Sequence, residues 1–484
     1  MNAPLPPTPQ PAADHAPLRE ILDRQRAGFL RDGPPRLDQR RADLKKLRAA
    51  LIAARPRIAQ AISADFSHRS AHETAMAEIL PVVQGISYLS RRLRRFMAPR
   101  RRHVAPTFWL GRARVEYQPL GVIGIVAPWN YPVALALMPL ATALAAGNRA
   151  MIKPSEITPR TSALLAEMLT ALFSPEQVAV VQGDAGCGAA FTALPFDHLV
   201  FTGSTGVGRA VMRAASDNLV PVTLELGGKS PVIIAPGHVD AQSAASIAFG
   251  KLTNAGQTCI APDYILLHEN DRDAFVTAYD RAVAALYPQG PASPDYSAIV
   301  NRNHFERLTR LTEDACAKGA DLRIMGRAPG TAADLSPMRA QTIAPMLVLD
   351  PSDAMAVMQQ EIFGPILPVQ TYRDIDQAIA LVNARPRPLA LYYFGPDDDS
   401  RRKVLSRTTS GNVGINNTLL HYAQDDLPFG GVGPSGMGAY HGIEGFRALS
   451  HAKGIYASGR WNAATILRAP FGRLADRVLG LLLR

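Results

Sequence analysis

The chain has 484 residues, more than a single hydrophobic core usually serves, so two or three domains are expected. Hydrophobic residues make up 47% and charged residues 19%, which is typical of a globular protein, and no apolar run reaches the roughly 18 residues that predict a membrane-spanning helix. The net charge of +11 comes without a recognisable nucleic-acid-binding module, and three cysteines are too few for a disulfide framework and indicate a reducing, cytoplasmic compartment.

The first residues and an arginine-rich segment each allow a simple interpretation. Residues 1–17 are rich in Pro and Ala and lack an apolar core, so we expect a disordered tail and not a signal peptide. Residues 91–102 hold seven arginines, which could form a patch for nucleic acid or anionic lipid, or a solvated helix end. We favour the solvated helix end, because such patches bind polyanions without specificity.

The predicted elements begin with helices, since residues 18–66 and 80–96 repeat apolar side chains at helical spacing. Residues 106–118 then change to a strand-like pattern. From residue 121 short apolar runs alternate with helical segments, and Thr158 is the expected N-cap of a helix that starts at Pro159. This alternation predicts a parallel, doubly wound sheet. The expected strands are 121–127, 150–153, 178–181, 198–202 and 222–226, and the expected helices are 132–146, 158–173 and 206–216.

A second α/β series follows, with strands expected at 232–234 and 264–267 and a helix at 271–286. The boundary between the two series is expected just after residues 225–229. Cys259 belongs to the second series and lies near this junction, and clefts between domains are common substrate sites.

Cys259 follows the turn-forming run 254–258 and is the most promising nucleophile in the chain. A thiol held on a loop can attack a substrate once it is deprotonated and accessible. The alternative is a packing role, because free cysteines are among the most buried residues in proteins. Cys187 and Cys316 match no motif and are expected to be bystanders.

Two features stand at the carboxyl ends of the expected strands, where ligands bind in open parallel sheets. Residues 203–208 follow a strand and open a helix, so their backbone N–H groups could face a phosphate. Their G-x-x-G-x-G order differs from the Rossmann G-x-G-x-x-G, and they could equally form an ordinary turn. Glu156 could accept hydrogen bonds from ribose hydroxyls or be a solvated carboxylate near a helix start.

Several motifs, taken together and in order, resemble those of NAD(P)-dependent aldehyde dehydrogenases, from about residue 18 to about residue 451. Segments 259–264 and 436–442 resemble the class 3 branch, where the chain is similar to bacterial enzymes acting on coniferaldehyde, with fatty-aldehyde enzymes as close relatives. The motifs are Pro128-Trp129-Asn130, Lys153-Pro154-Ser155-Glu156, residues 201–208, residues 225–231, Gly256-Gln257-Thr258-Cys259, Glu361-Ile362-Phe363-Gly364-Pro365 and residues 428–433.

The resemblance implies an α/β fold with a Rossmann-like cofactor domain, an α/β catalytic domain and a small β oligomerisation arm. It also implies a homodimer in which the arm reaches the partner. The expected ranges are 18–105 and 120–225 for the cofactor-binding domain, 226–438 for the catalytic domain, 106–119 and 439–458 for the arm, and 459–484 for an amphipathic C-terminal tail.

The resemblance also implies roles for individual side chains. Cys259 would attack the aldehyde carbon, and the Asn130 amide would stabilise the resulting oxyanion together with the Cys259 backbone N–H. Hydride transfer to NAD would leave a thioester, and Glu225 would activate the water that hydrolyses it. No cluster of His and Cys has the spacing of a metal site, so no metal is expected.

Further residues would hold the cofactor, for which NAD is expected. Lys153 and Glu156 would meet the adenine ribose, Glu361 the nicotinamide ribose, and Phe363 the nicotinamide ring. Outside this motif context, Glu361 could be a helix-end carboxylate and Phe363 a core aromatic. The residues expected near the pyrophosphate are Trp129, Gly203, Ser204, Thr205, Gly206, Val207 and Gly208.

Several alternatives remain open. A catalytically idle relative would lack the Cys, Glu or Asn, yet Cys259, Glu225 and Asn130 are all present. An enzyme that passes its thioester to coenzyme A is disfavoured by Glu225. The substrate is expected to be an aromatic aldehyde such as coniferaldehyde, with a long-chain fatty aldehyde as the alternative, and Tyr131, Leu135 and Ile260 are expected along its tunnel.

The C-terminal tail mixes leucines with arginines and is too short and too charged to span a bilayer. It could lie at a membrane surface as a peripheral contact, or pack on the partner subunit or over the substrate mouth. We favour packing on protein, because most amphipathic helices cover protein cores. No nucleic-acid partner is expected.

Overall fold

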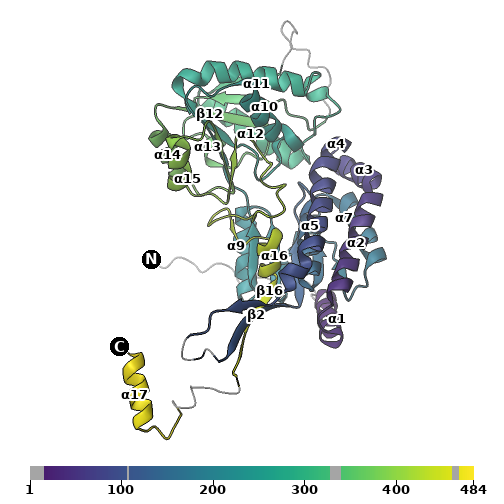
Figure 1. Cartoon of the computed structure of the whole chain (residues 1–484). Coiled ribbons are helices and arrows are strands. Elements are labelled where there is room, and N and C mark those ends of the chain that lie inside the picture. The colour runs from purple at the N-terminus through teal and green to yellow at the C-terminus, as the bar shows by residue number, and fades with distance from the viewer. Residues whose placement is uncertain (1–15, 106–107, 109, 327–339, 460–467, 484) are drawn as a thin grey trace, which may run out of the picture.

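The computed structural model describes residues 16–105, 108, 110–326, 340–459 and 468–483. It consists of two α/β lobes and a small arm of β-strands (Figure 1). The predicted α/β class with parallel sheets is confirmed, since two of the sheets are built mostly from parallel strands.

The first lobe contains a six-stranded sheet in the order β15-β7-β6-β3-β4-β5, parallel except for β15. Its central strands are rich in Val, Ile and Leu and almost fully buried, as expected for a parallel sheet covered on both faces. The strands are β3 (Val122–Val126), β4 (Arg149–Lys153), β5 (Val178–Val180), β6 (His198–Thr202), β7 (Val222–Glu225) and β15 (Gly436–Met437).

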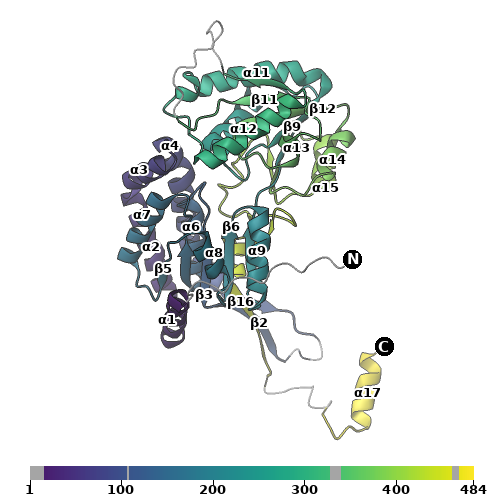
Figure 2. The same cartoon turned by 180° about the vertical axis from the view of Figure 1, so that it is seen from behind.

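Helices cover both faces of this sheet, and the alternation of side chains along each strand divides its core in two. Ile123 and Ile152 pack with α6 (Ala134–Ala146), which is buried along its whole length and ends at Gly147 in the left-handed conformation. Leu199 and Phe201 pack on the other face against α8 (Ala185–Thr192) and α9 (Thr205–Ser216), which are seen from behind in Figure 2.

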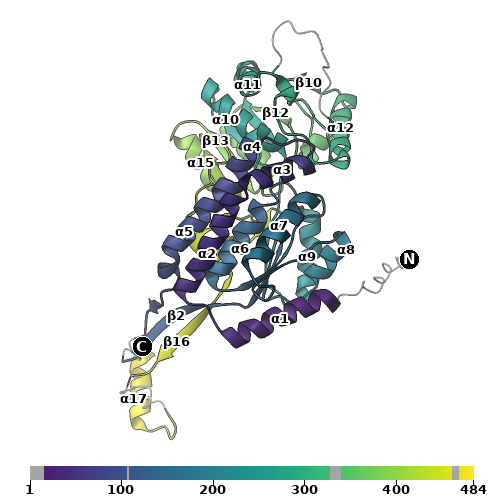
Figure 3. The ribbon, with the colours of Figure 1, turned by 90° about the vertical axis from the view of Figure 1, so that its right-hand side faces the viewer.

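The group of N-terminal helices packs mostly next to α6 and α7 (Pro159–Leu172), along one side of the lobe (Figure 3). Its first helix is the exception, because it contacts β3 and β4 and its Leu22 belongs to the core on the other face of the sheet. Residues 1–15 of the expected tail lie outside the described residues, but Ala16 and Pro17 already belong to the first helix, since proline is favoured in a first turn. The group is α1 (Ala16–Asp32), α2 (Leu37–Ala53), α3 (Arg55–Asp65), α4 (Ala71–Thr74), the π-helical turn η1 (Ala75–Ile79) and α5 (Leu80–Met97).

The start of α7 differs from the sequence prediction. Thr158 stands at the N-cap position before Pro159, but its buried hydroxyl makes no hydrogen bond among the described residues. The cap comes from Asp65 at the end of α3, whose carboxylate accepts hydrogen bonds from the backbone N–H of Arg160 (3.1 Å) and of Thr161 (2.9 Å). The capping side chain is therefore supplied by tertiary structure.

The second lobe contains a seven-stranded sheet in the order β10-β11-β12-β9-β8-β13-β14. Helices again flank a buried parallel centre, which continues the alternation expected after residue 231. The strands are β8 (Pro231–Ile234), β9 (Tyr264–His268), β10 (Asp321–Ile324), β11 (Met346–Leu349), β12 (Ile366–Tyr372), β13 (Ala390–Phe394) and β14 (Asn412–Ile415), and the helices are α10 (Ala241–Leu252), α11 (Arg272–Leu286), α12 (Arg302–Ala317), α13 (Ala356–Gln359), α14 (Ile375–Asn383) and α15 (Asp399–Arg407).

The arm is an antiparallel sheet of β1 (Arg100–Arg102), β2 (Arg112–Pro119) and β16 (Ser450–Ala457), and it points away from the second lobe (Figure 1). Strands cross the expected domain boundaries at two points. The 100–102 stretch joins the arm, because it pairs with β2, and Gly436–Met437 joins the first sheet, because it pairs with β7. The full division into domains remains our proposal.

The helix α16 (Gly442–Ala448) precedes β16 in the chain and packs on α5 and α6 of the first lobe. Beyond the arm, α17 (Arg473–Leu482) exposes Leu474, Leu479, Leu481 and Leu482. Residues 460–467 and 484 of the expected tail lie outside the described residues. Within the described ranges, no helix has the length and apolar character needed to cross a membrane.

Candidate active site

The loop that carries Cys259 is held in an unusual backbone conformation. Asn254 (φ 54°), Ala255 (φ 50°) and Gly256 (φ 77°) all adopt left-handed geometry directly after α10. The buried Gln257 then fixes the loop, because its amide donates to the carbonyls of Asn254 (2.9 Å) and Ala298 (3.0 Å). Strained backbone of this kind persists only where the surrounding structure enforces it.

Cys259 lies where two cavities meet. Thr202, Glu225 and Cys259 line both of them. The first cavity is mostly apolar, and Tyr131, Leu135 and Ile260 line it as expected. Its other walls come mainly from Met76, Phe249, Leu389, Leu419, Phe429 and Tyr440. This cavity suits an apolar substrate that brings one reactive group to the thiol.

The second cavity opens at the carboxyl ends of the strands of the first sheet. It brings together residues that are far apart in the sequence and were expected at the site. These are Trp129, Asn130, Gly203, Ser204, Glu225, Cys259, Glu361 and Phe363. Such a position is the usual place for a nucleotide in an open α/β sheet.

The start of α9 has features that fit a phosphate. Ser204 is its N-cap and accepts a hydrogen bond from the backbone N–H of Val207 (3.4 Å). Thr205, Gly206, Val207 and Gly208 form the first turn, and a side chain added at Gly206 would meet open space. The free N–H groups of a helix start favour an anion.

Lys153 and Glu156 form an ion pair at the end of β4. This strand pairs with β3, which leads to Trp129. Neither Lys153 nor Glu156 lines the second cavity itself. Lys153 is buried, whereas Glu156 is largely exposed. Burial opposes ionisation of Glu156, yet the hydrogen bond from the Lys153 ammonium lowers its pKa overall. Glu156 is therefore a charged carboxylate at neutral pH.

Glu225 ends β7 between two neighbouring strands, since its Cα pairs with Thr202 of β6 and with Gly436 of β15. The side chain is only 3% exposed, and within the described structure neither carboxylate oxygen has a hydrogen-bond partner. Burial raises the pKa of this carboxyl well above its ordinary value. A buried, unpartnered carboxyl beside a thiol is suited to taking up a proton.

Cys259 is partly accessible, but its surroundings disfavour the thiolate. Burial, followed by the nearby carboxylates of Glu361 and Glu225, raises the pKa of the thiol to about 12. The thiol is therefore protonated in this arrangement and needs a proton acceptor in order to react.

The Asn130 side chain lines the second cavity together with Cys259, and its amide is fixed. Asn130 is 3% exposed, and its Nδ2 donates to the Gln257 carbonyl at 3.1 Å. An amide nitrogen carries two N–H groups, so one remains for another acceptor. The geometry therefore offers one fixed donor to an oxygen formed at the Cys259 end of the cavities.

Glu361 and Phe363 also line the second cavity. Burial raises the pKa of Glu361 to about 8, and a side chain on Gly227 would overlap its carboxylate. Phe363 has a left-handed φ of 50° and packs edge-on against Trp129, with 5.3 Å between ring centroids.

Two residues of this cavity were missed from the sequence. His304 and Arg307 lie one turn apart on α12 and line the wall beside Glu361. The ring of His304 packs on Trp129 at 4.7 Å, and Arg307 donates to the carbonyls of Glu361 (3.3 Å) and Ile362 (2.5 Å). No local motif marks them, and the helix that carries them was not among the predicted elements, so the shared face of residues three apart could not be recognised.

Comparison with known proteins agrees with this geometry. A family model described as "Aldehyde dehydrogenase family" matches residues 11–455. The chain is 50% identical over 462 residues to a probable coniferyl aldehyde dehydrogenase of Pseudomonas aeruginosa, covering 96% of this chain and 95% of the relative. It is 48% identical over 469 residues to the coniferyl aldehyde dehydrogenase of Pseudomonas sp. strain HR199, covering 96% of each.

A solved structure of Staphylococcus aureus AldH, described as a substrate-bound state, has the same fold. It superposes with a TM-score of 0.88 at 35% identity and covers 96% of this chain and 99% of that one. Family match, close relatives and fold lead to one conclusion: the chain belongs to the aldehyde dehydrogenase family and is an NAD(P)-dependent enzyme that oxidises aldehydes.

Proposed function

We propose that this enzyme oxidises an aromatic aldehyde, such as coniferaldehyde, to the carboxylic acid with NAD. The observation that carries the proposal is the position of Cys259 and Glu225, which both line the apolar cavity and the strand-end cavity. Apolar walls suit an aromatic ring, and relatives 50% and 48% identical to this chain are described as acting on coniferyl aldehyde.

In this mechanism Cys259 attacks the aldehyde carbon after giving up its proton, for which Glu225 is the available acceptor. The remaining N–H of the Asn130 amide stabilises the oxygen of the thiohemiacetal, a contribution typically of about 2.7–4 kcal/mol for one such donor. The residues of the second cavity fit a dinucleotide, and when bound its nicotinamide supplies the acceptor for the hydride. After it has released the thiol proton to solvent, Glu225 removes a proton from the water that hydrolyses the thioester.

We further propose that the preferred cofactor is NAD, held by Lys153 and Glu156 at the adenine ribose and by Glu361 at the nicotinamide ribose. The ionised Glu156 would accept hydrogen bonds from ribose hydroxyls and repel a 2′-phosphate. Phe363 and Trp129 would flank the cofactor, with Gly203 and the first turn of α9 facing its pyrophosphate. The protein would act as a cytoplasmic homodimer without a nucleic-acid partner.

The test of substrate class is a steady-state panel of NADH formation with coniferaldehyde, benzaldehyde and alkyl aldehydes of rising length. The highest kcat/KM is expected for coniferaldehyde. A maximum at long alkyl chains would instead assign a fatty-aldehyde dehydrogenase, which the same apolar cavity could serve. Rates that depend on added coenzyme A would contradict hydrolysis by water.

A further inference from the structure

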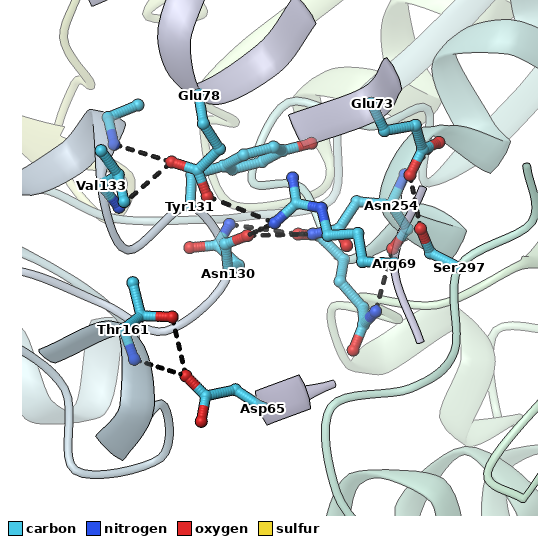
Figure 4. A network of polar contacts seen from close by, with 12 residues as sticks. Asp65, Arg69, Glu73, Glu78, Asn130, Tyr131, Val133, Thr161, Asn254 and Ser297 are labelled. Carbon is cyan, nitrogen blue, oxygen red and sulfur yellow. Dashed lines mark hydrogen bonds and ion pairs between the residues drawn. The ribbon is translucent and has the colours of Figure 1, made fainter. Parts of the chain in front are cut away.

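Behind the catalytic residues lies a group of buried charges that neither cavity exposes. Arg69, Glu73 and Glu78, called here the 69–78 clamp, come from one stretch of chain that includes α4 and the π-helical turn η1. Figure 4 shows the clamp between the Asn130 segment and the Asn254 segment. Single π-helical turns are frequent at functional sites.

Arg69 is fully buried and reaches the backbone of the proposed oxyanion donor. Its Nη1 donates to the carbonyl of Asn130 at 2.9 Å and lies 3.3 Å from the Glu78 carboxylate, which is also fully buried. The guanidinium stacks on the ring of Tyr131, 4.8 Å from its centroid, and faces Phe66 on another side. Arg69 therefore holds both Asn130 and the next residue.

Glu78 holds the other end of the same segment. Its Oε2 accepts hydrogen bonds from the backbone N–H groups of Val133 (3.1 Å) and Ala134 (2.7 Å), where α6 begins. A carboxylate is favourable at a helix start, and it satisfies N–H groups that have no partner within the helix. The segment from Asn130 to Ala134 is thus fixed at both ends.

Glu73 extends the clamp to the loop of the nucleophile. Its carboxylate accepts from the backbone N–H of Asn254 (3.1 Å) and from the Ser297 hydroxyl (2.5 Å). Asn254 in turn donates from Nδ2 to the same Asn130 carbonyl that Arg69 holds (3.1 Å). The Asn130 carbonyl is therefore the point at which the clamp joins the two catalytic loops.

Stability alone does not account for this arrangement. Burying one guanidinium and two carboxylates carries a large desolvation cost, and buried ion pairs can often be replaced by apolar residues without loss of stability. Burial raises the pKa of Glu78 to about 7, and Arg69 opposes that rise. A group that fixes two loops to each other, at such a cost, is better explained by geometry at the site they share.

We propose that Arg69, Glu73 and Glu78 are positioning residues that set the Asn130 amide against Cys259 for stabilisation of the oxyanion. This inference rests on the proposed roles of Asn130 and Cys259. The clamp acts on the reacting geometry through the Asn130 backbone and leaves the substrate cavity and the cofactor cavity unaltered, so it should affect kcat and not KM.

The primary experiment is a double-mutant cycle of Arg69→Lys and Asn130→Ala, measured by NADH formation. Arg69→Lys keeps the charge but loses the planar guanidinium, which lies over the Tyr131 ring while its Nη1 contacts both Asn130 and Glu78. We expect kcat to fall on the order of 100-fold, as for a small misplacement of a reacting group, with both KM values within about twofold. In the Asn130→Ala background, Arg69→Lys should have almost no further effect, because its path to the reaction is gone.

The matched control is Arg40→Lys, since Arg40 is also buried and also donates to backbone carbonyls, those of Pro35 and Ala145, away from both cavities. It should keep kcat even if it lowers the unfolding temperature as much as Arg69→Lys does. Glu73→Gln and Glu78→Gln provide a second approach if Arg69→Lys fails to fold. Either should lower kcat in the wild-type background and lose that effect in Asn130→Ala.

The outcomes distinguish the positioning role of the clamp from the oxyanion role of Asn130, on which it rests. An unchanged kcat in the folded clamp variants, or losses that multiply with that of Asn130→Ala, would overturn the positioning role. A normal kcat in Asn130→Ala itself would instead refute the proposed oxyanion role, and with it the premise of the clamp. A loss in Asn130→Ala together with normal clamp variants would remove the clamp alone.

Discussion

At the scale of single residues, the chemistry depends on an unreactive thiol and a buried carboxyl that share two cavities. Burial and two carboxylates raise the pKa of Cys259 to about 12, so free thiolate is scarce at neutral pH. Reactivity must therefore come from proton transfer during attack, and not from a standing anion. This places the nucleophile and its proton acceptor in one functional unit.

Replacement of Cys259 by serine tests the nucleophile. Cys259→Ser should abolish NADH formation, because a hydroxyl in this environment is a far weaker nucleophile than a thiol. Cys187→Ser and Cys316→Ser are matched controls that leave turnover nearly intact, since neither residue lines either of the two cavities shared by Glu225 and Cys259. Steady-state turnover retained in Cys259→Ser would reject the covalent mechanism.

Replacement of Glu225 by glutamine separates acylation from hydrolysis. If the base is required only for hydrolysis, Glu225→Gln should form about one equivalent of NADH per site and then stall with the acyl group on Cys259, seen as added mass. A slow or absent burst would assign Glu225 to activation of the thiol. Because its pKa is raised, wild-type deacylation should increase with pH above the usual carboxyl range, as the base form becomes populated. Full steady-state turnover in the variant would remove Glu225 from the mechanism.

Glu156 should decide between the two nicotinamide cofactors. Wild-type enzyme should have the higher kcat/KM with NAD, and Glu156→Gln should shift the NAD/NADP ratio about tenfold towards NADP, equivalent to about 1.4 kcal/mol for one lost repulsion. The reason is that Glu156 is ionised beside Lys153. A clear preference of the wild type for NADP would contradict this role.

The sequence predicted the site residues that stand in short, contiguous motifs and missed those that do not. Short, contiguous motifs pointed to Cys259 and to Glu225, and the structure places both on the same cavity walls. His304 and Arg307 were missed because they act through helical spacing on an element with an ordinary composition. The 69–78 clamp was missed because charged side chains are normally solvated, and only tertiary packing buries Arg69.

At the scale of elements, the loop before Cys259 is the most constrained piece of backbone in the site. Gly256 combines a φ of 77° with contact to the Gly364 carbonyl, which a Cβ would overlap. The loop of the nucleophile and the loop of Glu361 and Phe363 therefore meet at a position that only glycine fits.

Gly256→Ala tests this meeting point. It should lower the free energy of unfolding by more than the about 1–3 kcal/mol expected for left-handed strain alone, and it should reduce activity because both loops must shift. Gly237→Ala is the matched control, since Gly237 has a φ of 71° but open space around its Cα. Equal losses of stability in the two variants, measured by chemical denaturation, would show that the contact with Gly364 is unimportant.

Local signals predicted the interiors of elements better than their ends. The end of α6 at Gly147 followed from glycine at the position after a helix, and the structure has that residue in the left-handed conformation. The start of α7 did not follow in the same way, because the capping carboxylate comes from Asp65 in a distant helix. Sequence proximity carries no information about such a partner.

At the scale of the whole molecule, the alternation of strands and helices was enough to predict parallel sheets. Strands that pair with a partner far away in the sequence, such as β15 with β7, could not be predicted from local pattern. Nothing in the 436–437 stretch indicates that it pairs with β7, because two residues carry no periodicity. In the arm, no local pattern pairs β2 with β16, and only the family resemblance placed residues 106–119 and 439–458 together. Long-range pairing of this kind is decided by the fold and not by local pattern.

The arm leads us to predict a homodimer. The sheet order leaves β16 as an edge strand whose side chains are mostly exposed, and an open edge of this length is normally covered or paired. Light scattering on purified protein should report twice the mass of the chain across a dilution series. A monomer at all concentrations would be incompatible with the predicted assembly.

The return of β15 to β7 also has a consequence for biosynthesis. A ribosome delivers β7 long before it delivers Gly436–Met437, so a nascent chain exposes the edge beside Glu225 while most of the second lobe is being made. Interrupted translation would leave a polypeptide with the thiol of Cys259 but an unsupported strand under its proposed base. An open strand edge is a template for pairing with another chain, so a product that stops early would be prone to association at this edge.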